Sequence, residues 1–297
     1  MVFKELLLDM IKQSFELTYK KIFSNQIILE KLLLNLDKSF ENQYVFFYGN
    51  EINIKDQIKE MEILNIDKDF ILEFIAHINN SRDANFCVST LTKTDKKTFT
   101  LIAINMCDIE FISMLIHECV HSTEATVNSD QTSLVGWDFR NPKVQMIDLS
   151  IIDKIMGKVK YCSNLLINEI MTEKIARDVL KNFKELFGKM FSNANLEAYE
   201  SSYTTNLWIV EKFYEKEKAN IIRSRTIEKD KANELIDLEI FSILKDLIFG
   251  YEEGLLMAYN LDILGKTKEA KRLKEDKILE INEWLDYLWP NKERDKI

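Results

Sequence analysis

Residues 111–127 read FISMLIHECVHSTEATV and contain the motif H-E-x-x-H. Its apolar residues recur at three- and four-residue spacing, which is the period of an α-helix. His117 and His121 are four residues apart, so on a helix they lie one turn above each other on one face. Two neutral imidazoles on one face can occupy adjacent corners of a tetrahedral Zn²⁺ site. Glu118 follows the first histidine and can take a proton from a zinc-bound water.

A second stretch offers a third ligand. Residues 165–180, LLINEIMTEKIARDVL, have the apolar spacing of an amphipathic helix. Glu169 lies far beyond His121 in the chain, so we expect it to come from a separate helix. A carboxylate from a second helix completes a catalytic His₂Glu zinc site and leaves the fourth position for water. Glu173, one turn after Glu169, can accept the spare N–H of a ligating histidine and so fix its tautomer.

The two motifs together resemble those of a known family. HECVH followed by NEIMTE is similar to the motifs of the gluzincins, the thermolysin-like zinc metallopeptidases, whose second motif reads N-E-x-x-x-(D/E). The resemblance implies that His117, His121 and Glu169 bind one zinc ion, that Glu118 is the general base, and that Glu173 orients a zinc-bound histidine. It covers only the two motifs and the segment between them. It also implies a peptide or protein substrate.

The residue that would stabilise the oxyanion is less clearly marked. Thermolysin-like enzymes use a later histidine, but no His follows His121 here. The resemblance therefore implies a tyrosine in this role. Tyr161 is the first candidate, because it lies about two helical turns before Glu169, similar to the oxyanion tyrosine of some gluzincins. Tyr203 is the alternative. For either residue the other interpretation is a tyrosine whose ring packs while its hydroxyl stays in water.

The metzincin pattern does not fit the sequence. It needs a glycine three residues after the second histidine and a third histidine three residues later. This chain has Glu124 and Val127 at those positions. Glu124 continues the histidine face and points along the helix axis rather than around the metal. We therefore expect Glu124 to be a solvated carboxylate or one that lies behind the ligands.

The composition limits the possible partners and locations. The net charge of −9 argues against nucleic-acid binding, because a phosphate partner favours a basic face. No stretch approaches the roughly 18 uncharged apolar residues that a membrane span needs. The N-terminus has acidic residues in its apolar run and no small-residue cleavage site, so it is a poor signal peptide. We expect a cytoplasmic protein with no nucleic-acid or membrane partner.

The predicted fold is α+β and predominantly α-helical. With 7 Gly and 2 Pro among 297 residues, turns should be few and helices long. Residues 87–91 and 98–104 predict a β-hairpin that packs on the metal-binding helix, and residues 44–48 predict a buried strand. We divide the chain into a mostly helical N-terminal region (1–82), a zincin-like catalytic core with the hairpin and both motif helices (83–190), and a C-terminal helical lobe (191–297).

The sequence leaves several functions open. The first is zinc-dependent hydrolysis of peptide bonds, in which Glu118 activates a water on zinc. An endopeptidase is favoured, because the chain lacks the G-x-M-E-N motif by which related aminopeptidases bind the amino terminus. The alternative is a non-catalytic helical binding or regulatory protein with a vestigial or structural zinc site. A zinc hydrolase that cleaves a non-peptide amide is the third.

Overall fold

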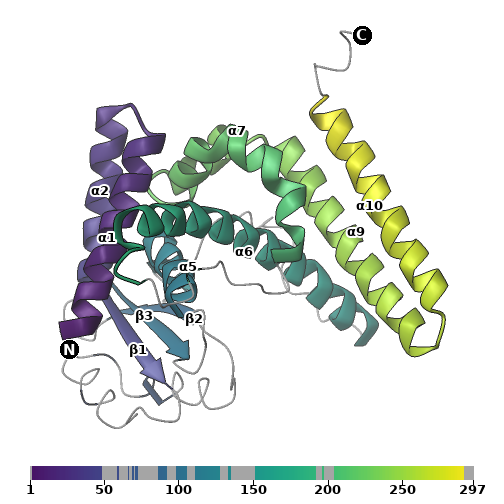
Figure 1. The fold of residues 1–297 in the computed structure, drawn as a ribbon, viewed down its shortest axis with the longest axis horizontal. Helices are drawn as coiled ribbons and strands as arrows, with labels where there is room; N and C mark the ends of the chain where they lie inside the picture. The colour runs from purple at the N-terminus through teal and green to yellow at the C-terminus, as the bar shows by residue number, and fades with distance from the viewer. Residues whose placement is uncertain are drawn as a thin grey trace. The chain divides into compact units, whose positions relative to one another are not determined.

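The chain is predominantly α-helical with a small β-sheet, as predicted (Figure 1). It forms two compact units, one of Met1–Phe139, Thr172–Glu200 and Ala219–Ala232, the other of Arg140–Met171, Ser201–Lys218 and Asn233–Ile297. The structure, a computed structural model, describes residues 2–48, 59, 66, 69, 71–72, 86–91, 98–105, 111–127, 133–134, 151–191, 196 and 204–290.

Two packed helices, α1 (Val2–Ile22) and α2 (Gln26–Glu41), open the first unit (Figure 1). The chain breaks between them at Asn25, whose side chain accepts hydrogen bonds from the N–H groups of Ile27 and Ile28 and so caps α2. The residues that α1 buries follow the helical period and include Leu7, Met10, Ile11 and Phe15.

A three-stranded sheet forms from β1 (Gln43–Tyr48), β2 (Phe86–Leu91) and β3 (Thr98–Asn105), in the order β1-β3-β2. β2 and β3 pair antiparallel, which confirms the predicted hairpin, while β1 runs parallel to β3. In β3, residues 101–104 are all fully buried. A strand with such a continuous buried run is covered on both faces, so β3 lies in the interior of the first unit.

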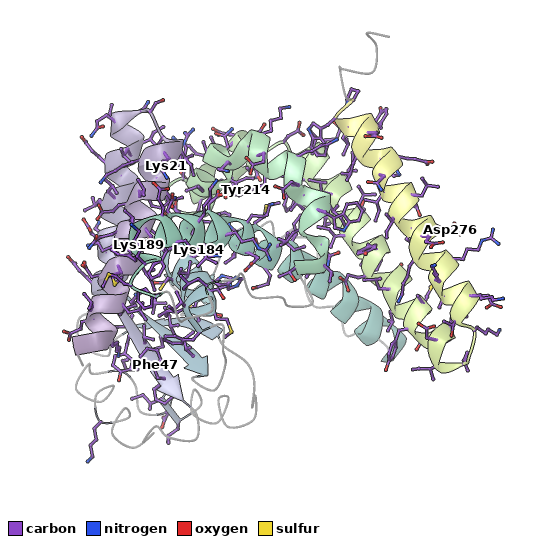
Figure 2. The ribbon with its side chains drawn as sticks, in the orientation of Figure 1. Lys21, Phe47, Lys184, Lys189, Tyr214 and Asp276 are labelled. Atoms are coloured by element: carbon purple, nitrogen blue, oxygen red, sulfur yellow. The ribbon has the colours of Figure 1, made fainter. Side chains whose placement is uncertain are left out.

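The histidine motif lies on α5 (Phe111–Glu124), which packs against β2, β3 and α2. At the start of the helix, the Phe111 ring meets the ring of Phe47 on β1 (labelled in Figure 2), and the ring centroids are 5.3 Å apart. Every residue from Ile112 to Glu124 is buried. Because a buried polar group without a partner is costly, the polar side chains of this helix must find partners in the interior.

The second motif lies on α6 (Ile151–Phe187), a helix much longer than the predicted segment 165–180. From Thr172 onward the helix belongs to the first unit, where Val179 and Phe183 are fully buried. The end of α1 is tied to this half by Lys21 (Figure 2), whose ammonium donates to the side chains of Asn182 at 2.7 Å and Glu185 at 2.6 Å.

The rest of the described chain is almost wholly helical. Among these helices, none is long and apolar enough to cross a membrane. The remaining elements are β4 (Thr126–Val127), β5 (Ser133–Leu134), η1 (Thr204–Asn206), α7 (Leu207–Arg225), η2 (Lys229–Lys231), α8 (Ala232–Leu235), α9 (Leu238–Ile263) and α10 (Thr267–Leu288).

Helices α9 and α10 pack against each other through a tight turn at Gly265 (Figure 1). Gly265 has a φ of 74°, the left-handed conformation in which a glycine is favoured. Its N–H donates to the Asp262 carbonyl, and the N–H of Lys266 donates to the Leu261 carbonyl. These two bonds form a Schellman motif, which satisfies the last carbonyls of α9 and stops the helix.

Candidate metal centre

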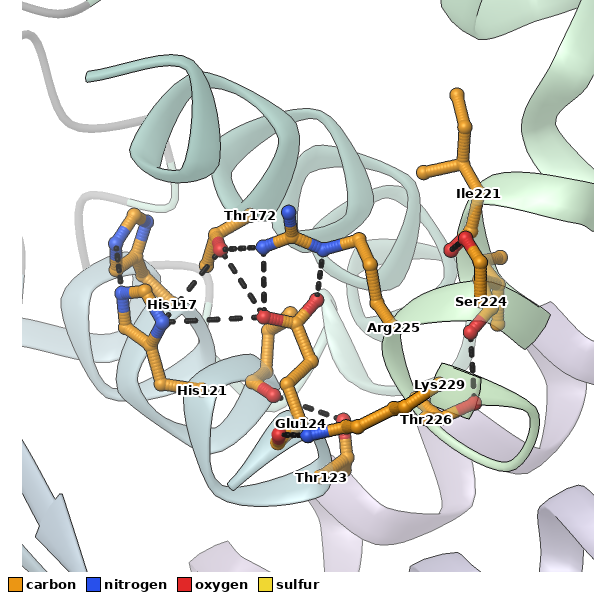
Figure 3. Close-up of polar contacts among 12 residues, drawn as sticks. His117, His121, Thr123, Glu124, Thr172, Ile221, Ser224, Arg225, Thr226 and Lys229 are labelled. Atoms are coloured by element: carbon orange, nitrogen blue, oxygen red, sulfur yellow. Dashed lines mark hydrogen bonds and ion pairs between the residues drawn. The ribbon is translucent and has the colours of Figure 1, made fainter. Parts of the chain in front are cut away.

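His117 and His121 meet at their Nε2 atoms, which lie 3.1 Å apart inside the first unit (Figure 3). Two nitrogens bound to one tetrahedral metal at about 2.0–2.1 Å would be about 3.3 Å apart, so the observed separation suits a shared ion. A carboxylate oxygen of Glu169 joins them, and the three ligand atoms all lie within 4.8 Å of one another. This cluster could hold a metal ion. Both histidines are buried, whereas Glu169 is half-buried.

The far side of the His117 ring is held by a carboxylate. His117 Nδ1 lies 3.0 Å from Glu173 Oε2, and the other oxygen of Glu173 accepts a hydrogen bond from Arg177 Nε at 2.8 Å. An ionised carboxylate only accepts, so the Nδ1 atom carries the proton. In the neutral ring this leaves the Nε2 lone pair directed at the shared position. Glu173 thus lies where a carboxylate can accept the second N–H of a metal-binding histidine.

The far side of the His121 ring faces a buried polar network (Figure 3). His121 Nδ1 lies 3.5 Å from Thr172 Oγ1 and 3.9 Å from Glu124 Oε2. Arg225 donates to both of these residues. Since Thr172 gives its own proton to Glu124, its oxygen is left to accept from His121 Nδ1. In the tautomer with its proton on Nδ1, the Nε2 atom of His121 also keeps its lone pair.

The two supports together explain why the cluster suits a cation. With the proton of each neutral ring on Nδ1, both Nε2 lone pairs face the shared position, where the Nε2 atoms lie 3.1 Å apart. A cation placed between the rings would be bound by both lone pairs. The histidine, histidine and carboxylate donors fit a borderline divalent metal of the kind that imidazole binds.

Glu118 and Cys119 sit between the two histidines in the motif, and both are buried. Gln43 Nε2 lies 3.9 Å from the Cys119 sulfur. Burial raises the pKa of the Cys119 thiol well above its ordinary value, so the group stays protonated at neutral pH. Only a thiolate is a good ligand or nucleophile, which leaves Cys119 as a packing residue.

The two tyrosine candidates are not placed by the structure. Tyr161 belongs to the helical backbone of α6, but its side chain lies outside the described part of the chain, and Tyr203 lies outside the described residues altogether. Their assignment to the oxyanion stays a prediction.

The comparisons with known proteins give no relative. No family model, curated protein or solved structure matches the chain. The interpretation of the cluster therefore rests on its own geometry and on the two motifs.

Sequence reasoning missed Thr172 and Arg225, and it left Glu124 undecided. Glu124 is fully buried and bound to Arg225, so it is not a solvated carboxylate. Thr172 stands in the second motif between the two glutamates and could have been suspected from that position. Arg225 sits in a stretch rich in Lys, Arg and Glu, where a buried arginine cannot be told from the usual exposed ones.

Proposed function

We propose that the protein is a zinc metallopeptidase of the gluzincin type, in which His117, His121 and Glu169 bind one zinc ion. The observation that supports this most is the pair of histidine Nε2 atoms 3.1 Å apart beside a Glu169 carboxylate. The carboxylate of Glu173 on the opposite face of the His117 ring adds to it, because metal-ligating histidines almost always donate their other N–H in this way.

The proposed fold of the catalytic part is zincin-like. In support, α5 with the histidine motif packs on the small sheet, and the glutamate motif follows on α6. Both features are expected of that fold, and neither is unique to it.

The chemistry would divide between the metal and Glu118. Zinc, when bound, would polarise the scissile carbonyl and lower the pKa of a water toward about 7. Glu118 would take a proton from this water and pass it to the leaving amine, which makes it both general base and general acid. A tyrosine hydroxyl from Tyr161 or Tyr203 would donate to the developing oxyanion. We expect internal bonds of peptides or proteins to be cut.

The decisive test combines metal content with peptide cleavage. We expect about one zinc per purified chain and cleavage of a mixed peptide library followed by mass spectrometry. Glu118→Gln should keep its zinc and lose activity by at least about 10²-fold, because general acid–base catalysis typically contributes that much. His117→Asn should lose both zinc and activity.

A second candidate is a binding or regulatory protein with a structural zinc. The burial of His117, Glu118 and His121 favours it, since structural sites are closed to water. Zinc bound at full stoichiometry without cleavage of any library peptide would support this candidate and refute the peptidase. Cleavage that persists in Glu118→Gln would refute the proposed mechanism itself.

A further inference from the structure

We infer that Arg225, Glu124 and Thr172 form a positioning network that holds the His121 ring for metal binding. The end of α7 would then set how tightly the site binds its metal. The inference rests on the proposed metal site, and it assigns a role to residues that lie outside both motifs.

Hydrogen bonds connect each of these three residues to the other two (Figure 3). Arg225 Nε donates to Glu124 Oε1 at 2.7 Å, and Arg225 Nη2 donates to Glu124 Oε2 at 2.8 Å. The same Nη2 donates to Thr172 Oγ1 at 2.7 Å, and this hydroxyl donates to Glu124 Oε2 at 3.3 Å. Two parallel bonds between a guanidinium and a carboxylate fix both planes, so the orientation of the Glu124 carboxylate is set by Arg225.

A role in stability alone does not explain this arrangement. Arg225 and Glu124 are both fully buried. Removing two charges from water is so costly that a buried ion pair is often no more stabilising than apolar residues of the same volume. What the pair offers instead is a defined geometry next to His121. The ring nitrogen Nδ1 faces the Thr172 hydroxyl at 3.5 Å and the Glu124 carboxylate at 3.9 Å.

Residues 225–229, which include Arg225, also contact the backbone of Glu124. The Lys229 ammonium donates to the Glu124 carbonyl oxygen, at the end of α5. The last carbonyls of a helix have no partner within the helix and attract positive charge. Residues 225–229 therefore bind both the side chain and the main chain of Glu124, one helical turn after His121.

The two histidines differ in where their support comes from. His117 is held by Glu173, which is itself bound by Arg177 one turn further along the same helix. His121 depends on Arg225, which lies on a different helix much later in the chain. Loss of the Arg225 network should therefore loosen His121 while leaving the support of His117 intact.

The experiment measures metal affinity in the full-length protein. We would titrate Zn²⁺ against a chromophoric chelator and record the visible absorption of Co²⁺ in the same site. Thr172→Val removes only the hydroxyl and keeps the shape, so it is the main variant. We expect its zinc affinity to fall about 10- to 100-fold, with an altered Co²⁺ spectrum, and Thr172→Ser to restore both.

A matched control distinguishes positioning from general loss of a buried hydroxyl. Thr18 is a buried threonine in the same unit, and its hydroxyl bonds to Ser14 and Asn182, both at 2.7 Å. Thr18→Val should bind zinc as the wild type does, whatever it loses in stability.

Glu124→Gln is a second, independent variant, and it should weaken zinc binding in the same range as Thr172→Val. Wild-type zinc affinity and Co²⁺ spectra in both folded variants would overturn the inference, even if the protein binds zinc and cleaves peptides. A wild-type protein that binds no zinc would refute the proposed function. This outcome differs from the one that overturns the inference, in which the wild type and both variants bind zinc equally well.

Discussion

At the scale of single residues, the pKa of Lys229 predicts how the free energy of unfolding depends on pH. Burial lowers the pKa of the Lys229 ammonium from 10.5 to about 8, with the charge of Glu124 opposing the shift and that of Arg225 adding to it. Between these two values the unfolded state holds a proton that the folded state has released. The free energy of unfolding should therefore rise with pH across this window.

The free energy of unfolding should rise by about 1–3 kcal/mol across this pH window. One pKa unit corresponds to about 1.4 kcal/mol, and the partial exposure of the Lys229 side chain reduces the effect. Other groups titrate in the same range, so the measurement is a difference between wild type and Lys229→Met from urea unfolding between pH 7.5 and 10.5. The exposed Lys231→Met serves as control and should keep the wild-type rise. A difference that stays flat with pH would contradict the prediction.

Sequence reasoning at this scale succeeded where spacing carries the information. His117 and His121 were predicted to share a helix face, and Glu169 was predicted to arrive from a second helix. The structure brings all three together. Arg225 could not be predicted, because its partner Glu124 is 101 positions away. No local pattern specifies a contact of that range, and only packing determines it.

At the scale of elements, two glycines of the C-terminal hairpin should respond in opposite ways to the same change. Gly265 adopts a φ of 74°, where an added Cβ is strained, so Gly265→Ala should lower the free energy of unfolding by about 1–2 kcal/mol. Gly250 lies inside α9, and an added Cβ would meet nothing within 4 Å. Gly250→Ala should therefore raise the free energy of unfolding by about 0.5–1 kcal/mol.

Thermal and urea unfolding of the two variants, compared with the wild type, check this pair. Each glycine is the control for the other, because the composition change is identical. A destabilised Gly250→Ala would mean that α9 is crowded at that position.

The extent of the helices was only partly predictable from the sequence. The apolar spacing of residues 231–248 predicts one helix, whereas the structure ends α8 at Leu235 and continues α9 from Leu238 past Gly250 to Ile263. At Gly254 an added Cβ would lie 2.8 Å from the Lys277 side chain of α10, so this glycine permits close packing between the helices. Tertiary packing therefore overrides the low helix propensity of glycine, and a single-sequence pattern does not contain that information.

At the scale of the whole molecule, the metal should act as a ligand that stabilises the folded state. An ion that binds only the folded chain at a thousand-fold excess over its Kd adds about 4 kcal/mol. For a chain of a few hundred residues, this raises the Tm by on the order of 10 °C. Calorimetry with and without a chelator measures the shift, and His117→Asn should show none. A chelator-insensitive wild type would argue against a metal bound in the native state.

The long reach between Arg225 and the end of α5 has a consequence for the order in which the protein is made. A ribosome synthesises the histidine motif and the glutamate motif well before it reaches residue 225. The nascent chain would thus carry its three candidate ligands before Arg225 is present to position His121. We expect the growing chain to bind a metal ion about 10- to 100-fold more weakly until that arginine has been added and has folded against Glu124.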